Sequence, residues 1–162
     1  MADGHQFKAY LPGGASGGIL PASKADIPLD FGGRLAEEGC FVGSHAVVIL
    51  SDQDNVWQVA KNLMQFFAHE SCGQCTPCRS GTDKAVELMA APCSDTDLLG
   101  ELAVTMADAS ICGLGQAAPN PLLSAIKYFP QDMNRMDIIQ GGTRQNESVA
   151  AKAKPAGKRV LG

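Results

Sequence analysis

The hydrophobic positions along this chain change from a strand-like to a helix-like spacing after residue 52. Residues 40–50, CFVGSHAVVIL, are rich in Val and Ile, which predicts one buried strand, broken at Gly43. Short apolar stretches within residues 5–30 are the candidate partners of that strand, because a single strand is not stable alone. The glycine-rich segment 11–18, LPGGASGG, is too flexible for the interior of an element and predicts a loop.

From Asp54 onwards, apolar residues recur at spacings of three and four, which is typical of amphipathic helices packed against a core. The predicted helices cover residues 54–69, residues 82–91, a segment capped by Ser94 or Asp95, and a segment from Asn120-Pro121 to just before Pro130. Asp52 or Asp54 is available to cap the first helix, and Pro92 ends the second. The pattern therefore predicts an α+β chain whose C-terminal half is a small helical bundle.

Residues 70–81, ESCGQCTPCRSG, carry three cysteines in a C-x-x-C-x-x-C run, and a further cysteine follows after 33 residues. The four are Cys72, Cys75, Cys78 and Cys112. A cubane cluster presents four iron corners, and three thiolates in one winding loop reach three of them, so the fourth ligand must come from elsewhere. Two antiparallel helices of comparable length between Cys78 and Cys112 would return the chain to its starting point. The spacing thus predicts one 4Fe-4S cluster, with these four cysteines as its metal-binding residues.

Small and basic residues around the cysteines suit a negatively charged inorganic core. Glycines let the backbone pass close to a cluster and point N–H groups at its sulfurs, and four flank the cysteines: Gly73, Gly81, Gly113 and Gly115. Four thiolates leave such a cluster with a net charge of about −2 when oxidised and about −3 when reduced. Arg79 and Lys84 are either close enough to offset part of this charge or are solvated surface residues. His69 either tunes the cluster or is a surface or capping histidine.

A zinc site is the main alternative for the cysteines, because zinc also binds four thiolates. Zinc sites usually pair two separate C-x-x-C knuckles, whereas three cysteines in one run with a distant fourth is the commoner 4Fe-4S arrangement. The other two cysteines are not predicted to be ligands. Cys40, at the start of the predicted strand, is expected to be a small buried hydrophobic residue, and Cys93 is expected to be a bystander in the turn between two helices.

The composition is that of a globular chain: 45% of the residues are hydrophobic and 19% are charged, and no apolar run is long enough to span a bilayer. The N-terminus lacks the features of a secretory signal, so we expect a cytoplasmic protein, in which six cysteines favour metal ligation over disulfides. A net charge of −4 argues against nucleic acid as a partner. Residues 134–162, basic towards their end and without apolar periodicity, are expected to form a disordered tail.

Four segments resemble a known family, the flavoprotein that binds NADH in respiratory complex I and its relatives in NAD-linked formate dehydrogenases and bidirectional hydrogenases. Residues 69–81, HESCGQCTPCRSG, resemble the family's cluster loop, and residues 109–130, ASICGLGQAAPNPLLSAIKYFP, resemble its fourth-ligand segment. The second is most similar to the formate dehydrogenase beta subunit. Residues 13–33 and 39–52 resemble the end of the ubiquitin-like domain that precedes the cluster domain, so the resemblance extends over about residues 9–133.

The resemblance implies three regions. Residues 1–52 would form a partial ubiquitin-like (SLBB-type) β segment, residues 53–133 a four-helix 4Fe-4S-binding bundle, and residues 134–162 the tail. Members of the family begin with a large Rossmann-like domain for FMN and NADH, and no segment of that kind is present in this sequence. The chain is therefore expected to correspond to the C-terminal part of the flavoprotein and not to be catalytic alone, with FMN and NAD bound only in the missing domain or in a partner.

The function implied by the resemblance is the relay of single electrons between FMN and the next iron-sulfur subunit. The expected partners are a flavin- and NADH-binding domain or subunit, a small 2Fe-2S thioredoxin-like subunit, and a large iron-sulfur or formate dehydrogenase alpha-type subunit. No direct membrane insertion is expected, although the protein could be peripheral on the cytoplasmic face of a membrane complex. Two rival hypotheses are a zinc-stabilised structural or interaction module without redox activity, and a non-functional truncated product whose strand partners are missing.

Overall fold

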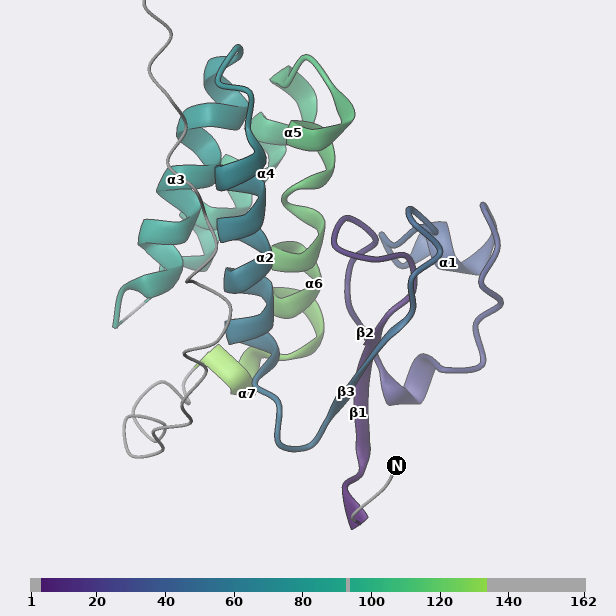
Figure 1. The fold of residues 1–162 in the computed structure, drawn as a ribbon. Coiled ribbons are helices and arrows are strands. Elements are labelled where there is room, and N and C mark those ends of the chain that lie inside the picture. Colours follow the sequence, from purple (N-terminus) through teal and green to yellow (C-terminus); the bar gives the residue numbers. More distant parts are fainter. Residues whose placement is uncertain (1–3, 93, 134–162) are drawn as a thin grey trace, which may run out of the picture.

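The computed structural model describes residues 4–92 and 94–133, in which a small sheet and its loops lie beside a group of upright helices (Figure 1). The strands are β1 (Phe7–Leu11), β2 (Leu20–Pro21) and β3 (Val48–Ser51). They form one antiparallel sheet in the order β2-β1-β3, with Ala9 opposite Pro21. β1 and β2 come from the segment 5–30, where the partners of the third strand were predicted.

The predicted strand over residues 40–50 is wrong in its first part, because only β3 at its end is a strand. The preceding backbone binds the glycine-rich loop instead, and the N–H of Phe41 donates to the carbonyl of Gly17 at 3.2 Å. The two segments approach so closely that a Cβ on Gly13 would lie 2.3 Å from the carbonyl oxygen of Phe41. The loop thus takes up hydrogen-bonding groups that a longer strand pairing would have used.

The longer helices follow the predicted order along the chain. The helical elements are η2 (Ala22–Lys24), α1 (Arg34–Glu37), α2 (Val56–Glu70), α3 (Thr76–Ala90), α4 (Thr96–Ala109), α5 (Gly113–Ala117), α6 (Asn120–Tyr128) and α7 (Pro130–Met133). Helices α2, α3, α4 and α6 occupy the positions of the predicted helices, and the short elements are additional. The mixture of a small antiparallel sheet with a helix-rich second half confirms the α+β class. That the first part is a ubiquitin-like domain stays a prediction.

The helix starts correct two of the predictions. Asn55, rather than Asp52 or Asp54, is the N-cap of α2, and its side-chain oxygen accepts a hydrogen bond from the backbone N–H of Gln58 at 2.9 Å. For α4 the expected cap is confirmed, since the Asp95 carboxylate accepts from the N–H of Leu98 at 3.0 Å. The second predicted helix begins earlier than expected, with consequences for the cysteines that are described below.

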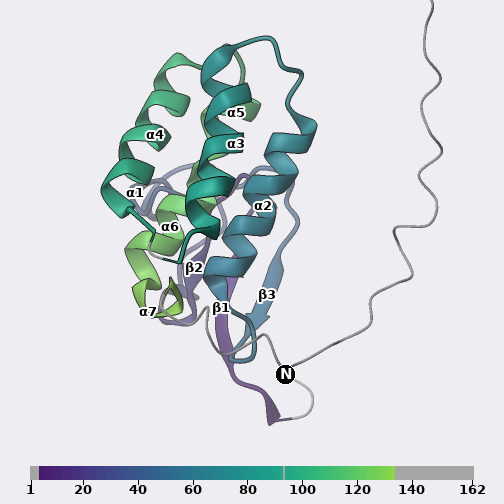
Figure 2. The same ribbon diagram turned by 90° about the vertical axis from the view of Figure 1, so that its left-hand side faces the viewer.

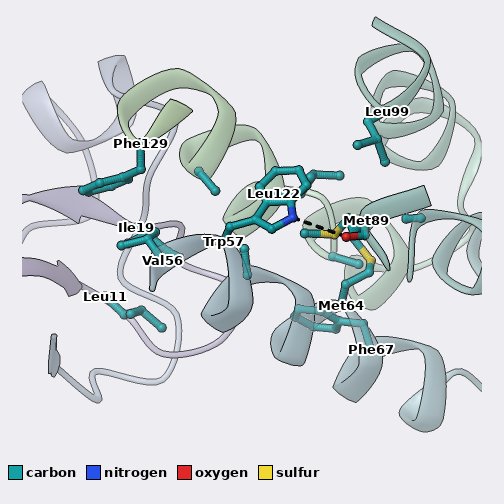
Figure 3. Packing of buried hydrophobic residues seen from close by; sticks show 14 of the residues in the cluster. Leu11, Ile19, Val56, Trp57, Met64, Phe67, Met89, Leu99, Leu122 and Phe129 are labelled. Carbon is teal, nitrogen blue, oxygen red and sulfur yellow. Dashed lines mark hydrogen bonds between the residues drawn. The ribbon is translucent and has the colours of Figure 1, made fainter. Parts of the chain in front are cut away.

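The main hydrophobic core joins the sheet to the helices. Trp57 of α2 lies at its centre without exposed surface, and its indole N–H donates to the carbonyl of Met89 in α3 at 3.3 Å (Figure 3). Leu11 and Ile19 from the β region pack into the same core as Leu122 of α6. The proposed division at residue 52 therefore stays a prediction about domains, while the packing across it is continuous.

Two polar contacts also hold the β region to the helices. The buried carboxylate of Asp132 in α7 accepts from the ammonium of Lys8 in β1 at 2.6 Å and from the backbone N–H of Val56 at 2.7 Å. Glu38, after α1, binds Lys24, and it also accepts hydrogen bonds from Tyr128 and Lys127 at the end of α6. These contacts join β1, and the connection between β2 and β3, to the helical part of the protein.

No helix between residues 4 and 133, Cys93 apart, combines the length and the apolar character that crossing a membrane requires. The predicted tail over residues 134–162 and the predicted bystander Cys93 lie outside the described residues.

Candidate metal centre

The clustered cysteines lie where α2 passes into α3. Cys72 is in the connection, Cys75 is the N-cap of α3 and Cys78 lies in its first turn. Cys112 is the N-cap of the short helix α5. In both ribbon views, the α2–α3 connection and α5 lie at the same end of the helices, whereas α7 lies at the opposite end (Figures 1 and 2). The fold therefore returns the fourth cysteine to the end of the bundle that carries the run.

The cysteine run was predicted to be a single winding loop, and this prediction is wrong, because α3 begins inside the run. The helix starts at Thr76 instead of Thr82, and Pro77 occupies its first turn, where the missing N–H of proline costs no hydrogen bond. Cys75 and Cys78 thus stand at the N-cap and the third helical position, whose side chains lie close together at a helix start. Cys72 approaches from the preceding connection.

The connection before α3 is fixed by polar contacts on both sides of Cys72. The hydroxyl of Ser71 lies 3.3 Å from the sulfur of Cys78 and accepts from the N–H of Gly73 at 3.3 Å. The guanidinium of Arg79 donates to the carbonyl of Gly73 at 2.8 Å. Gly73 has a φ of +76°, a left-handed conformation that a side chain would strain. Together these contacts hold the Cys72 segment against the start of α3.

The turn between α4 and α5 approaches the sulfur of Cys75. The pKa of the Cys75 thiol is lowered below its ordinary value, chiefly by the backbone N–H of Ile111, then by that of Cys78, and to a smaller extent by the hydroxyl of Ser110. Hydrogen-bond donors of this kind favour the thiolate, which is the form that binds metals. Ile111 immediately precedes Cys112, so the same turn places the fourth cysteine beside the first turn of α3.

Gly115 permits this close approach of α5 to α3. A Cβ at Gly115 would lie 2.8 Å from the Cβ of Cys78 and 2.5 Å from the hydroxyl oxygen of Ser110. Gly81 plays a similar role one turn further along α3, where a Cβ would lie 2.6 Å from the side chain of Met106 in α4. Of the four predicted glycines, Gly115 is therefore the one whose close approach to a cysteine the structure shows, whereas a Cβ on Gly113 would meet no atom within 4 Å.

The donor set at this end fits a thiolate-bound cluster. Cys72 and Cys112 are exposed, Cys75 is partly exposed, and Cys78 is buried. The backbone N–H groups near Cys75 suit the negative sulfurs of a cluster, and the buried hydroxyl of Ser110 makes no well-formed hydrogen bond within the described part of the chain. Among the described residues, no three His, Cys, Asp or Glu side chains lie together as ready ligands of one metal ion. The four-cysteine ligand set stays a prediction.

The other sequence candidates have structural partners or lie elsewhere. Cys40 is buried in a second small core with Tyr10 and Leu20, and burial raises the pKa of its thiol to about 11, as suits a small hydrophobic residue. Lys84 pairs with Glu87 at 2.8 Å on the exposed surface of α3. His69 lies in the last turn of α2.

Sequence reasoning missed two residues of the site, Ser71 and Ser110. A serine one residue before Cys72, or two residues before Cys112, could have suggested a hydroxyl close to a ligand sulfur. Neither position stands out in the sequence, because serine is equally common in loops and at helix ends.

Cysteine thiols, backbone N–H donors and glycines gather at one end of the bundle, as is expected of a helical protein that binds a metal cluster through cysteines. Residues 58–136 match the family model described as the NADH-ubiquinone oxidoreductase-F iron-sulfur binding region. This region of the chain therefore belongs to that family, which confirms the resemblance and supports a 4Fe-4S cluster as its cofactor.

Curated relatives and solved structures agree with this family. The chain is 35% identical over 138 residues to a subunit of the NADH-quinone oxidoreductase of Streptomyces coelicolor, with 82% of this chain and 30% of the relative covered. It is 36% identical over 136 residues to the HndC subunit of the NADP-reducing hydrogenase of Solidesulfovibrio fructosivorans, with 80% and 28% covered. A crystal structure of an NAD+-reducing [NiFe]-hydrogenase in the H2-reduced state matches with a TM-score of 0.69 and 31% identity over 80% of this chain and 23% of that one.

The chain thus spans about a third or less of the length of these relatives.

Proposed function

We propose that this chain is the 4Fe-4S electron-transfer module of an NADH-dependent oxidoreductase complex, with Cys72, Cys75, Cys78 and Cys112 as the cluster ligands. The observation that supports the proposal is the close packing of α5, whose N-cap is Cys112, against the first turn of α3, where a Cβ on Gly115 would lie 2.8 Å from the Cβ of Cys78. The family match and the names of the relatives, subunits of NADH-quinone oxidoreductases and of a hydrogenase, support the same class of complex.

When bound, the cluster would supply reversible one-electron chemistry, which no side chain of the described residues can supply by itself. The chain's own residues would hold, shield and tune it. Cys78 is buried, so its side would face the protein, whereas Cys72 and Cys112 are exposed and would lie on the solvent-facing side. Backbone N–H groups at Ile111 and Cys78 would stabilise negative charge on the sulfur of Cys75.

The relay would connect FMN to the next iron-sulfur subunit. NADH would give two electrons to FMN in a flavin-binding domain or partner subunit, and this module would pass them on one at a time. A small 2Fe-2S thioredoxin-like subunit and a large iron-sulfur or formate dehydrogenase alpha-type subunit are the proposed neighbours, in a cytoplasmic complex. The amino-acid sequence of residues 109–130 favours an NAD-linked formate dehydrogenase, and this part of the proposal rests on the resemblance alone.

The first test is iron and sulfide analysis of the anaerobically purified chain, with electron paramagnetic resonance after dithionite reduction. We expect about four irons and four sulfides per chain and the signal of a reduced cluster. One zinc, with no iron, no sulfide and no signal, would replace this proposal with the zinc-stabilised module.

The second test asks which cysteines are the ligands. Replacing Cys112 with Ser should greatly weaken the cluster and lower the bound iron, because the variant loses one of the four thiolate ligands. The matched control is Cys93→Ser, which should keep the full iron content. Equal losses in both variants, or a loss in the control alone, would show that the fourth ligand has been assigned wrongly.

A further inference from the structure

Ser110 has an unusual hydrogen-bonding position between α4 and α5. Its backbone N–H donates to the carbonyl of Met106 at 3.2 Å, and its carbonyl accepts from the side-chain amide of Gln116 at 3.0 Å. The residue is 5% exposed, and its hydroxyl lacks a well-formed partner within residues 4–92 and 94–133. Both backbone groups are therefore used for structure, and only the hydroxyl is left over.

The hydroxyl lies in a narrow space beside the cysteines. A Cβ on Gly115 would come within 2.5 Å of it and within 2.8 Å of the Cβ of Cys78, so the space between these residues admits a glycine only. The unpaired hydroxyl thus lies beside the first turn of α3, which carries Cys75 and Cys78.

A buried hydroxyl without a hydrogen-bond partner destabilises a folded protein, because the hydrogen bond that it makes with water in the unfolded chain is lost. A bound cofactor with acceptor atoms would give the Ser110 hydroxyl a partner. The other buried serine, Ser124, avoids this cost because its hydroxyl donates to the carbonyl of Asn120 at 2.7 Å. At Ser110 the cysteines of the site lie nearby, and their sulfurs would be negatively charged acceptors once they bind a cluster.

We infer that Ser110 is a positioning residue whose hydroxyl donates a hydrogen bond to a cysteine sulfur of the bound cluster and thereby raises the reduction potential of the cluster. The inference rests on the proposed function. Taking up one electron makes a cluster more negative by one charge, so a donor at a sulfur stabilises the reduced form more than the oxidised form. Removing the hydroxyl should therefore lower the midpoint potential without removing a ligand.

The experiment is an anaerobic redox titration of the full chain, followed by electron paramagnetic resonance, with iron content measured on each sample. Ser110→Ala should hold about four irons and titrate at a lower potential than the wild type. Ser110→Thr keeps a hydroxyl and should return the potential towards the wild-type value. Ser124→Ala, at a serine of equal exposure near Cys40, should titrate as the wild type does.

Each outcome decides the question. A Ser110→Ala protein with a full cluster and an unchanged potential would overturn the inference, as would an equal shift in Ser124→Ala. If Ser110→Ala does not hold iron, Ser110→Gly, which removes the same hydroxyl, is titrated in its place. If neither variant holds four irons, the hydroxyl serves assembly and the inference is wrong. A wild-type protein without iron and sulfide would overturn the proposed function itself, a result that the wild-type sample reveals separately.

Discussion

The two ends of α3 are built from different chemistry. Its C-terminal end carries Met89, which is fully buried and whose carbonyl accepts from the indole of Trp57. Its N-terminal end carries Cys75 and Cys78, next to the unpaired hydroxyl of Ser110. Apolar packing fills one end, whereas the other end gathers cysteines and a buried hydroxyl without a partner among the described residues. The comparison predicts that changes at the packed end act on the stability of the fold, and that changes at the cysteine end act on the bound metal.

The largest expected effect is at the packed end. Trp57→Ala should lower the free energy of unfolding by about 3–5 kcal/mol, because it empties the centre of the core and leaves the Met89 carbonyl unpaired. Urea denaturation followed by circular dichroism measures this loss, and Val104→Ala, on the exposed face of α4, should stay within about 0.5 kcal/mol of the wild type. If the free energy of unfolding fell only slightly in Trp57→Ala, the packing around Trp57 would not be a main source of the stability of the fold.

Gly115→Ala should act mainly on the cysteine end of α3, and its main effect should be on the bound iron and not on the stability of the fold. The added methyl would meet Ser110 and Cys78, at an overpacking cost of about 1–3 kcal/mol that a gain of about 1 kcal/mol in helix propensity partly offsets. We expect a clear loss of bound iron, together with a loss of stability in the metal-free protein that is smaller than the loss in Trp57→Ala.

The matched control for Gly115→Ala is Gly100→Ala in α4, where a Cβ would meet no atom within 4 Å. This variant should keep its iron and gain up to about 1 kcal/mol in stability. Unchanged iron content in Gly115→Ala would mean that the close approach of α5 to α3 is not needed for the cofactor.

A smaller effect is expected at the N-cap of α4, which starts near the packed end. Asp95→Ala should cost about 1 kcal/mol, because the N–H of Leu98 loses its side-chain acceptor. Asp108→Ala removes a carboxylate from the exposed surface near the other end of α4 and should not destabilise the protein. Equal losses in the two variants, measured by thermal unfolding, would point to general electrostatics instead of a cap.

The smallest effect concerns Glu38, which joins the β region to α6 away from both ends of α3. The hydrogen bond from Lys24, followed by that from Tyr128, lowers the pKa of Glu38 to about 2. A pKa that is lower in the folded state stabilises the protein when the carboxylate is ionised. The stability difference between the wild type and Glu38→Gln should be full at neutral pH and shrink as pH falls from about 4.5 towards 2.

Urea denaturation at a series of pH values checks this window for Glu38, and Glu37→Gln, at an exposed neighbour, is the matched control. Iron content at neutral pH should be the same in Glu38→Gln as in the wild type. A loss of iron in Glu38→Gln but not in Glu37→Gln would contradict this expectation, because it would show that the contacts of Glu38 affect metal binding at the cysteines.

Much of the fold could be predicted because its cues are local. The spacing of apolar residues located α2, α4 and α6, and Asp95 was recognisable as a cap. The start of α3 was missed because Pro77 was not weighed as a first-turn residue inside the cysteine run. The strand before β3 was overextended because nothing local in residues 40–47 says that a distant glycine loop would take its hydrogen bonds.

By itself, the sequence determined the family, the α+β class and the cysteines that are candidate ligands, since residue identity and spacing along one chain are sufficient for these. The tertiary structure decided what surrounds the cysteines. The approach of Ile111 and Ser110 to Cys75, and the space kept open by Gly115, arise from helices that are distant in sequence and pack together. Hydrogen bonds to a sulfur require positions accurate to a fraction of an ångström, and only the packing of the side chains between those helices provides them.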